Sequence, residues 1–364
     1  MLSLHKTIGH VILLLVCLSF GAPRAMGIII SLDFTHDTYI TTNATAQAAL
    51  TAAASDVSAA ITTSLTAITG ADDPITGNDG STNVTVDWGF SYTNPTTNLS
   101  ETYDPPTIAA DTVTIFAGGR NITGSTLGIG GPNSAGIGLG ASGFGSEVIA
   151  AMADMESQSN TIHPRGGGPT MGNFVGSRTL QGTTAFYDLD FGSSLGSITF
   201  DLDSDNNGAQ DNAAQLAAYW HFDHTTAVAA GKNDFYSVAV HELLHAVGIG
   251  TADSWDDLAS GTTWSGPVAV ALNGGSGVGL LHTDSSHIVQ SLMSPRVSDG
   301  VLQEVVMDPN ITVGTRKELT LMDMAFLQDI NWQTVTIPEP GGFIVVLLGV
   351  MGIAPRRPMR SSHS

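Results

Sequence analysis

Apolar residues recur at regular spacings in several separate stretches of the chain. In residues 44–68 they lie three or four positions apart, which predicts an amphipathic helix with one core-facing side, ended by Gly70. These positions are Leu50, Ala54, Val57, Ile61, Leu65 and Ile68. Residues 28–34, 84–90 and 111–117 are rich in β-branched and aromatic residues and predict strands. This mixture of helices and strands indicates an α+β fold.

The middle of the chain predicts a loop, two helices and a further strand. Residues 118–145 are so rich in glycine that we expect a flexible surface loop. A phosphate-binding loop is disfavoured, because neither a Lys-Ser/Thr ending nor a Rossmann pattern accompanies the glycines. Residues 146–156 and 211–220 predict short helices. Ser197–Asp203 (SITFDLD) alternates apolar and polar residues and predicts a half-exposed strand.

The most specific pattern lies in residues 235–247, a largely apolar helix that Asn233 or Asp234 can cap. It contains the sequence H-E-x-x-H, with His241, Glu242 and His245. Residues four apart lie on one face of a helix, so the two histidines can present their imidazoles to one metal ion. Polar groups on a buried helix are costly unless they are paired, and a metal supplies that pairing. The spacing is that of a zinc hydrolase in which Glu242 acts on a bound water.

A third protein ligand, which catalytic zinc usually has, is absent from the residues that follow directly. The metzincin pattern places this ligand at position 251, where the chain has Thr251, a poor zinc ligand. No glutamate stands between residues 251 and 300. The candidates in that interval are His282, His287, Asp253, Asp256, Asp257 and Asp284.

The residues after this interval resemble those of the leishmanolysin-like metzincins. Residues 284–287 (Asp-Ser-Ser-His) are followed by 291–295 (Ser-Leu-Met-Ser-Pro), which look like a Met-turn, and residues 319–332 look like a final helix. The resemblance covers about residues 234–332. It departs in Ile288, where an aromatic residue often follows the histidine, and in the absence of a tyrosine after Met293. In that family the third histidine arrives late, after an insertion and just before the Met-turn.

The resemblance implies the ligand set and the fold. His287 is then the third ligand, with His282 as the alternate, Met293 lies beneath the zinc, and residues 251–286 form the insertion. The fold expected for residues 28–334 is a zincin-like domain, a mixed twisted sheet packed on helices that include the zinc-binding active-site helix. One catalytic Zn²⁺ is the implied cofactor.

The implied activity is that of a zinc endopeptidase acting on peptide or protein substrates. Glu242 takes a proton from the attacking water and passes it to the leaving amine. By fold analogy, the strand at 197–203 pairs with an extended substrate. Two alternatives stay open: an envelope or matrix protein whose zinc site has little or no turnover, and an adhesin in which the motif is coincidental.

A second metal pattern involves alternating carboxylates. Asp201, Asp203 and Asp205 precede residues 206–208 (Asn-Asn-Gly) and resemble a calcium loop. Counted from Asp201, Asn206 stands where that loop has its glycine, and no glutamate closes the loop. A solvated acidic turn is the competing interpretation, and Ca²⁺ is the lesser expectation.

Composition restricts the partners. Charged residues make up 12% of the chain and the formal net charge is −21. This balance excludes nucleic acid as a partner, because Lys and Arg are needed there to displace counterions. It suits an exported protein that carboxylates keep soluble.

The N-terminal segment predicts export. In residues 1–27, a polar start with Lys6 precedes an apolar run and a small-x-small cleavage site at 25–27, as in a secretory signal peptide. A membrane anchor is the alternative, but the apolar run is short for a span. Cys17, the only cysteine, lies within this segment.

The C-terminal segment, residues 335–364, has three parts: Pro338-Glu339-Pro340, an apolar run, and arginines. It resembles the PEP-CTERM sorting signal. The resemblance implies transient insertion into the inner membrane and recognition by exosortase-type machinery. The protein would then be secreted or attached to the cell envelope of a Gram-negative bacterium. A plain C-terminal anchor is the alternative.

Overall fold

The structure is a computed structural model that describes residues 27–103, 107–281 and 284–335. The predicted signal peptide and sorting signal lie outside the described residues, apart from their innermost positions, and so does His282. None of the helices in the described ranges is both long and apolar enough to cross a bilayer. Mixed sheets and helices confirm the α+β class.

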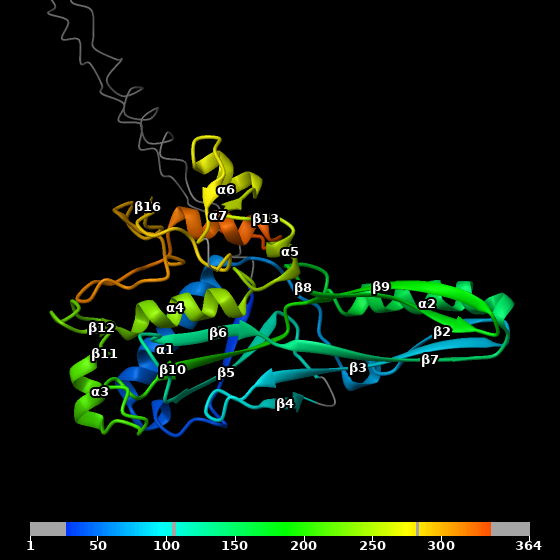
Figure 1. Ribbon diagram of the computed structural model, residues 1–364, viewed down its shortest axis with the longest axis horizontal. Coiled ribbons are helices and arrows are strands. Elements are labelled where there is room, and N and C mark those ends of the chain that lie inside the picture. The colour runs from blue at the N-terminus through cyan, green and yellow to red at the C-terminus, as the bar shows by residue number, and fades with distance from the viewer. Residues whose placement is uncertain (1–26, 104–106, 282–283, 336–364) are drawn as a thin grey trace, which may run out of the picture.

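A four-stranded sheet forms the centre of the body (Figure 1). Its order is β1 (Ile29–Asp33), β5 (Thr112–Arg120), β10 (Leu195–Asp201) and β6 (Gly128–Pro132). The first three strands are parallel, and β6 pairs antiparallel with β10 at the edge. The strands predicted at 28–34 and 111–117 are confirmed as β1 and β5.

Strand β10 is buried at every position, so the prediction of a half-exposed strand is wrong. Successive side chains point to opposite faces of a sheet, and here both faces are covered. Phe200 packs on Phe235 of the helix above, with ring centroids 4.3 Å apart. Its neighbour Thr199 donates to the carbonyl of Pro95. Thr199 is thus satisfied inside the protein, whereas the buried Ser197 hydroxyl meets no hydrogen-bond partner among the described residues.

Helix α1 (Ala44–Ala60) begins at Asn43, whose side chain accepts from Ala46 N–H at 3.1 Å. It packs against helix α4 (Phe235–Ala246). The prediction that α1 continues to residue 68 is wrong beyond Ala60. Ile61 is extended and bridges Thr334, and Ile68 bridges Ile108. The apolar positions after residue 60 are buried as expected, but β-branched residues there favour extended pairing over helix.

The glycine-rich stretch 118–145 is not a flexible loop, and that prediction is wrong. It supplies the end of β5, the edge strand β6, and β7 (Ser134–Ser142). Strand β7 pairs along its length with β3 (Thr82–Thr93). In β6 the glycines permit close packing, since a Cβ at Gly130 would lie 2.2 Å from the carbonyl oxygen of Glu242.

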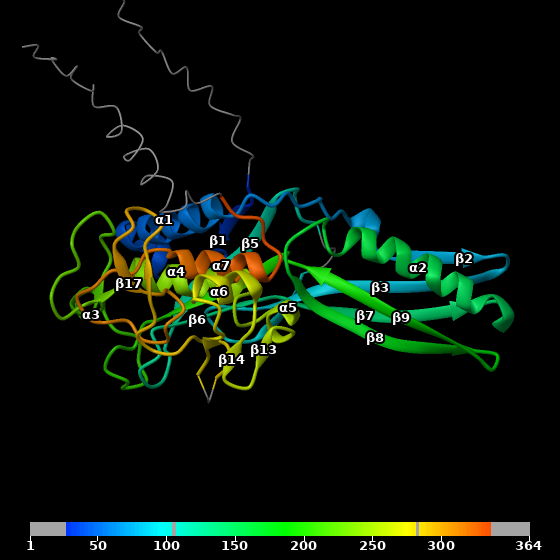
Figure 2. The same ribbon diagram turned by 90° about the horizontal axis from the view of Figure 1, so that it is seen from above.

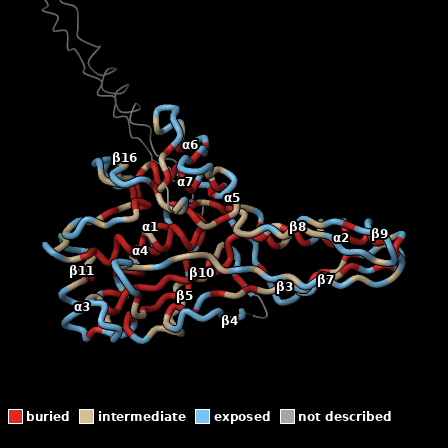
Figure 3. The backbone as a smooth tube through the Cα atoms, in the orientation of Figure 1, coloured by how far each residue is buried: buried red, intermediate tan, exposed pale blue. Residues whose placement is uncertain are grey.

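An elongated arm extends from the body and has its own hydrophobic core (Figures 1, 2 and 3). One layer contains β2 (Ile75–Asp79), β3, β4 (Ser100–Tyr103) and β7. The other is the hairpin of β8 (Thr170–Leu180) and β9 (Thr183–Gly192). Helix α2 (Val148–Ile162) packs on β2, β3 and β9. The strand at 84–90 and the helix near 146–156 are confirmed, but nothing in the sequence pattern predicted the arm.

The chain after the arm returns to the body. It forms α3 (Ala213–Tyr219), β11 (Trp220–His221), β12 (Asn233–Asp234) and α4. Residues 251–281 then form the small subdomain of α5 (Asp253–Asp256), β13 (Ala259–Ser260), β14 (Thr263–Trp264), α6 (Pro267–Leu272) and β15 (Val278–Gly279). The hairpin of β16 (Met293–Pro295) and β17 (Leu302–Glu304) and the helix α7 (Leu321–Asp329) complete the described chain. Short 3₁₀ turns lie at Ile40–Thr42, Gly70–Asp72 and Gly145–Glu147.

Buried tryptophans hold residues 251–281 and helix α7 against the body. Trp255 and Trp264 stack with centroids 3.9 Å apart, and the Trp264 indole donates to Asp329 at the end of α7. The Trp332 indole donates to the Val247 carbonyl at 2.8 Å, at the C-terminal end of α4. Residues 251–281 and α7 are thereby fixed against the helix that carries H-E-x-x-H.

Candidate metal centre

Helix α4 begins and ends close to the predicted residues. Asp234 caps it, accepting from Ser237 N–H at 3.2 Å, and Arg316 pairs with the same carboxylate at 2.8 Å. The chain leaves the helix at Gly248, whose φ of +111° favours glycine. These two ends fix the rotation of α4, so that one face of its C-terminal half is directed toward the segment containing His287.

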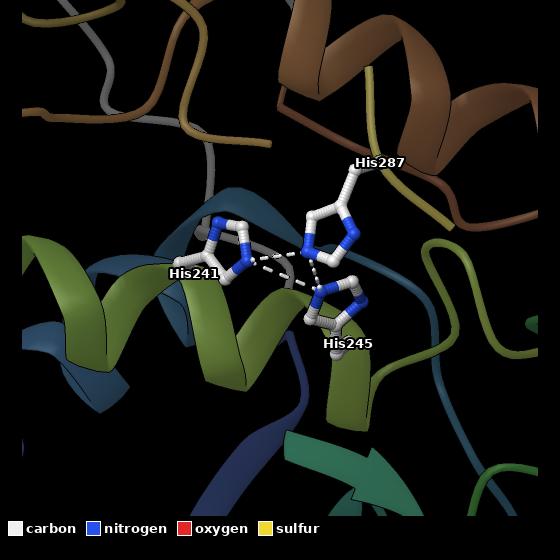
Figure 4. Close-up of side chains that lie close together, drawn as sticks. All are labelled: His241, His245 and His287. Carbon is white, nitrogen blue, oxygen red and sulfur yellow. Dashed lines mark hydrogen bonds between the residues drawn. The ribbon is translucent and has the colours of Figure 1, made fainter. Parts of the chain in front are cut away.

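Three histidines converge on one point (Figure 4). The Nε2 atoms of His241, His245 and His287 lie 3.2 Å from one another in all three pairs. His241 and His245 are one helical turn apart, whereas His287 arrives 42 residues after His245 from a different segment. The structure therefore brings together the three histidines that the sequence singled out.

The outer nitrogen of each ring has its own acceptor. Nδ1 of His241 lies 2.8 Å from the carbonyl oxygen of Val306, and Nδ1 of His245 lies 2.8 Å from that of Ile249. Nδ1 of His287 lies 2.6 Å from Oδ2 of Asp284. A carbonyl or carboxylate oxygen only accepts, so each Nδ1 carries the proton and each Nε2 presents a lone pair. Three lone pairs that face one another form a group that could hold a cation.

Burial keeps the rings of His241 and His245 in the neutral form that binds metals. It lowers the pKa of His245 to about 4, and it lowers the pKa of His241 well below its ordinary value, with the neighbouring imidazoles adding to the effect. Against the opposing effect of partial burial, hydrogen bonds from Ser286 and His287 lower the pKa of Asp284. Asp284 is therefore anionic and a strong acceptor for His287.

The geometry of the three nitrogens fits zinc. Two ligands at corners of a tetrahedron with Zn–N bonds of about 2.05 Å lie about 3.3 Å apart. The observed 3.2 Å separations match that value. Three histidines leave a fourth position, and a cleft of about 640 Å³ lies at this point. A structural zinc site would be closed by a fourth protein ligand.

Glu242 lies in this cleft between the two helical histidines in sequence. It is 5% exposed, and burial raises the pKa of its carboxyl to about 8, with the Gly130 backbone N–H opposing the effect. A Cβ at Gly128 would lie 2.8 Å from its Oε1. The edge strand β6 thus presses against the glutamate because its residues have no side chains there.

One wall of the cleft is β6, together with residues 125–127. Strand β10, which was expected to pair with an extended substrate, lies inside the sheet between β5 and β6, so that prediction is wrong. Its backbone groups are used on both sides. The other wall comes from Val306, residues 308–311 and Lys317, and Tyr219, Asn233, Ser237 and Val238 also line the cleft. The sequence reasoning missed these wall residues, which carry no motif.

The prediction that Met293 lies beneath the metal is also wrong. Its side chain is 50% exposed and its backbone pairs with Glu304 in the β16–β17 hairpin. The buried methionine next to the site is Met307, which is 0% exposed and directly follows Val306, the residue that accepts from His241. Both methionines belong to a Met-x-Pro sequence, and only burial distinguishes them.

A buried carboxylate supports the segment of Val306. Asp323, in the first turn of α7, is 0% exposed. It accepts the N–H groups of Val306 at 3.1 Å and of Thr320 at 2.9 Å. The predicted final helix at 319–332 therefore has a further role, since it holds the carbonyl that orients His241.

The second predicted metal group is rearranged. Asp203 and Asp205 lie close together, but their third partner is Asp211 and not Asp201. One carboxylate oxygen of Asp201 is occupied by the N–H groups of Ile122 and Asp203, each at 3.0 Å. The ligand group with Asp201 in it is therefore wrong.

No protein-family profile, curated protein or solved structure matches this chain. Its chemistry is therefore inferred from the site itself.

Proposed function

We propose that this chain is an exported zinc endopeptidase with a zincin-like catalytic domain. The observation that carries the proposal is the set of three Nε2 atoms at 3.2 Å from one another, each with its Nδ1 bound to an acceptor. His241, His245 and His287 would hold the ion. Zinc bound there supplies a water of lowered pKa and polarises a substrate carbonyl.

Glu242 is the proposed general base. A cation held by the three histidines would favour the ionised form of its carboxyl against the effect of burial, and that carboxylate would take a proton from the attacking water and later give it to the departing amine. Helix α4 contains no other Glu or Asp residue. Two further carboxylates line the cleft: Asp284 is bonded to His287 and positions that ring, and Asp308 accepts the N–H groups of Ser291 and Asn310.

The cleft suits an extended peptide. Strand β6 pairs with β10 on one side only, so its outer backbone groups can pair with a substrate strand. Its glycines keep side chains from blocking access to Glu242. The wall at 306–311 then faces substrate side chains across the cleft.

The test is a peptide-library or casein cleavage assay with a zinc count on the same preparations. We expect cleavage that a chelator abolishes and zinc restores. Glu242→Gln should keep one zinc per chain and lose cleavage by about 10²-fold or more, because removal of a general base costs about 10²–10⁴-fold. Zinc retained by the wild type without any cleavage would reject the peptidase.

A second candidate is an envelope or matrix protein with a zinc site of little turnover. The arm favours it, since Val175 and Phe186 on the β8–β9 hairpin are 71% and 74% exposed. Exposed apolar side chains that lie together can mark a surface for contact with another protein. The same assay separates the two functions. For both candidates, export and attachment at the envelope are part of the proposal. They rest on the resemblance of the terminal segments to a signal peptide and to the PEP-CTERM sorting signal.

A further inference from the structure

The loop between β10 and α3 combines buried carboxylates that have no counter-charge. Asp203 and Asp211 are 3% and 5% exposed, and Asp205 is exposed. One oxygen from each lies within 4.8 Å of the others. Among the ion pairs of the described residues, none involves these three carboxylates.

One buried oxygen in this group has no partner. Oδ2 of Asp211 accepts from the N–H of Ser204 at 2.9 Å and from its hydroxyl group. Oδ1 of Asp211 is buried and meets no hydrogen-bond donor within the described ranges. An unpaired, buried carboxylate oxygen is costly, and a cation beside Asp203 and Asp205 would satisfy it.

The ligand positions of an EF-hand loop fit this segment better when they are counted from Asp203 instead of Asp201. Asp203, Asp205 and Asn207 then occupy the first, third and fifth positions, and Gly208 the sixth, where an EF-hand-type loop has its glycine. Gly208 has a φ of +85°, which suits glycine at that sharp turn. Asp211 falls at the ninth position, another ligand position of such loops.

We propose that residues 203–211 bind one calcium ion. Asp203, Asp205 and Asp211 supply carboxylate oxygens, and position 209 is the place from which such loops use a backbone carbonyl. Oxygen-only ligands on a loop select a hard cation, and calcium tolerates the irregular geometry that magnesium does not. The closing glutamate is replaced by Ala214, so we expect weaker binding than in intracellular calcium buffers.

The loop is connected to the cleft wall. Asn206 accepts from Gly124 N–H at 2.6 Å, and Asp201 accepts from Ile122 N–H at 3.0 Å. Residues 125–127 line the cleft directly after these contacts. Calcium would therefore stabilise this wall. The consequence for cleavage rests on the proposed function, whereas calcium binding itself does not.

The test uses the zinc-loaded full chain and measures calcium binding by calorimetry. The weakest calcium modules have dissociation constants of about 10⁻³ M, so calcium is added up to about ten times that concentration. Terbium luminescence sensitised by Tyr219 and Trp220 provides a second measurement. We expect one saturable site and a calcium-dependent rise in Tm. Asp211→Asn should weaken binding at least tenfold and remove the Tm rise, while Asp87→Asn, an exposed carboxylate on the arm, should change neither.

Asp205→Asn protects the test against misfolding, because its side chain is exposed and its replacement leaves the buried part of the loop intact. It should also weaken binding, with zinc content unchanged. No saturable site in the wild type, or wild-type affinity in both loop variants, would overturn the proposal. Because zinc is counted separately, failure of the calcium site is distinguishable from failure of the histidine centre.

Discussion

Nδ1 of His287 lies 2.6 Å from Oδ2 of Asp284, three residues earlier in the chain. The other two histidines of the centre use backbone carbonyls for the same purpose. Among the three histidines, His287 alone uses a side-chain acceptor. This bond fixes the ring that enters the centre from outside α4.

We expect Asp284→Asn to weaken zinc binding by about 10–100-fold, the usual effect of losing a carboxylate partner of a ligating histidine. The asparagine can still accept a hydrogen bond but lacks the charge that orients the imidazole and raises its basicity. Competition with a chromophoric chelator measures the affinity. Asp257→Asn, an exposed carboxylate in the same stretch 251–286, is the matched control, and an equal loss in the control would contradict the role of Asp284.

His287→Ala should abolish zinc retention through gel filtration, because two histidines on one helix leave the ion without its third protein ligand. His282→Ala should retain one zinc per chain. Metal analysis of the two proteins decides between them. Zinc lost from the His282 variant and kept by the His287 variant would reverse the assignment of the third ligand.

The sequence predicted α4 because three independent signals agree there: a cap at Asn233 or Asp234, an apolar helical pattern and a glycine after the end. It predicted β1 and β5 from their composition. It did not predict that Ile61–Ile68 is extended. The spacing of apolar residues there is compatible both with a helix and with an extended segment whose residues are buried by pairing, as Ile68 pairs with Ile108. Tertiary pairing decided that segment.

Within the site, the histidines could be found because metal ligation leaves a residue-type signature. The support of those histidines could not, since Val306 and Ile249 act through backbone carbonyls that any residue has. Gly130 was misinterpreted for a related reason. Glycine permits flexibility and also permits close packing, and the chain alone does not distinguish the two.

Adjacent glycines in β6 offer a matched pair of variants. A Cβ at Gly130 would lie 2.2 Å from the Glu242 carbonyl oxygen, whereas one at Gly131 would meet no atom within 4 Å. Gly130→Ala should therefore lower the free energy of unfolding by about 1–3 kcal/mol or more and displace Glu242. Gly131→Ala should lie within about 1 kcal/mol of the wild type. Urea unfolding and the zinc-dependent cleavage rate measure both effects, and equal behaviour of the two variants would contradict the packing of β6 on α4.

His163 is buried in the arm and forms no ion pair among the described residues. It is 0% exposed, stacks on Phe191 with centroids 4.2 Å apart, and meets the Ser159 hydroxyl at 2.8 Å through Nδ1. Its Nε2 has no hydrogen-bond partner among the described residues. Burial lowers the pKa of His163 to about 3.

This histidine should make the arm sensitive to acid. Its pKa in the folded state, about 3, lies below the value of about 6.5 expected in the unfolded state, so the unfolded chain binds the proton first. The stabilisation is complete above pH 6.5 and is lost as pH falls toward 3. Between pH 7 and pH 5 the loss is up to about 2 kcal/mol.

His163→Phe keeps an aromatic ring against Phe191 and cannot titrate. We expect its free energy of unfolding to fall less than that of the wild type between pH 7 and pH 5, by up to about 2 kcal/mol, whatever its stability at pH 7. Urea denaturation at the two pH values gives this difference. Loss of zinc in acid would lower the stability of both proteins equally, so it cancels in the difference between them. His221→Gln, in strand β11 of the body, is the control outside the arm. An unchanged pH dependence in the His163 variant would show that this ring is not the acid-sensitive group.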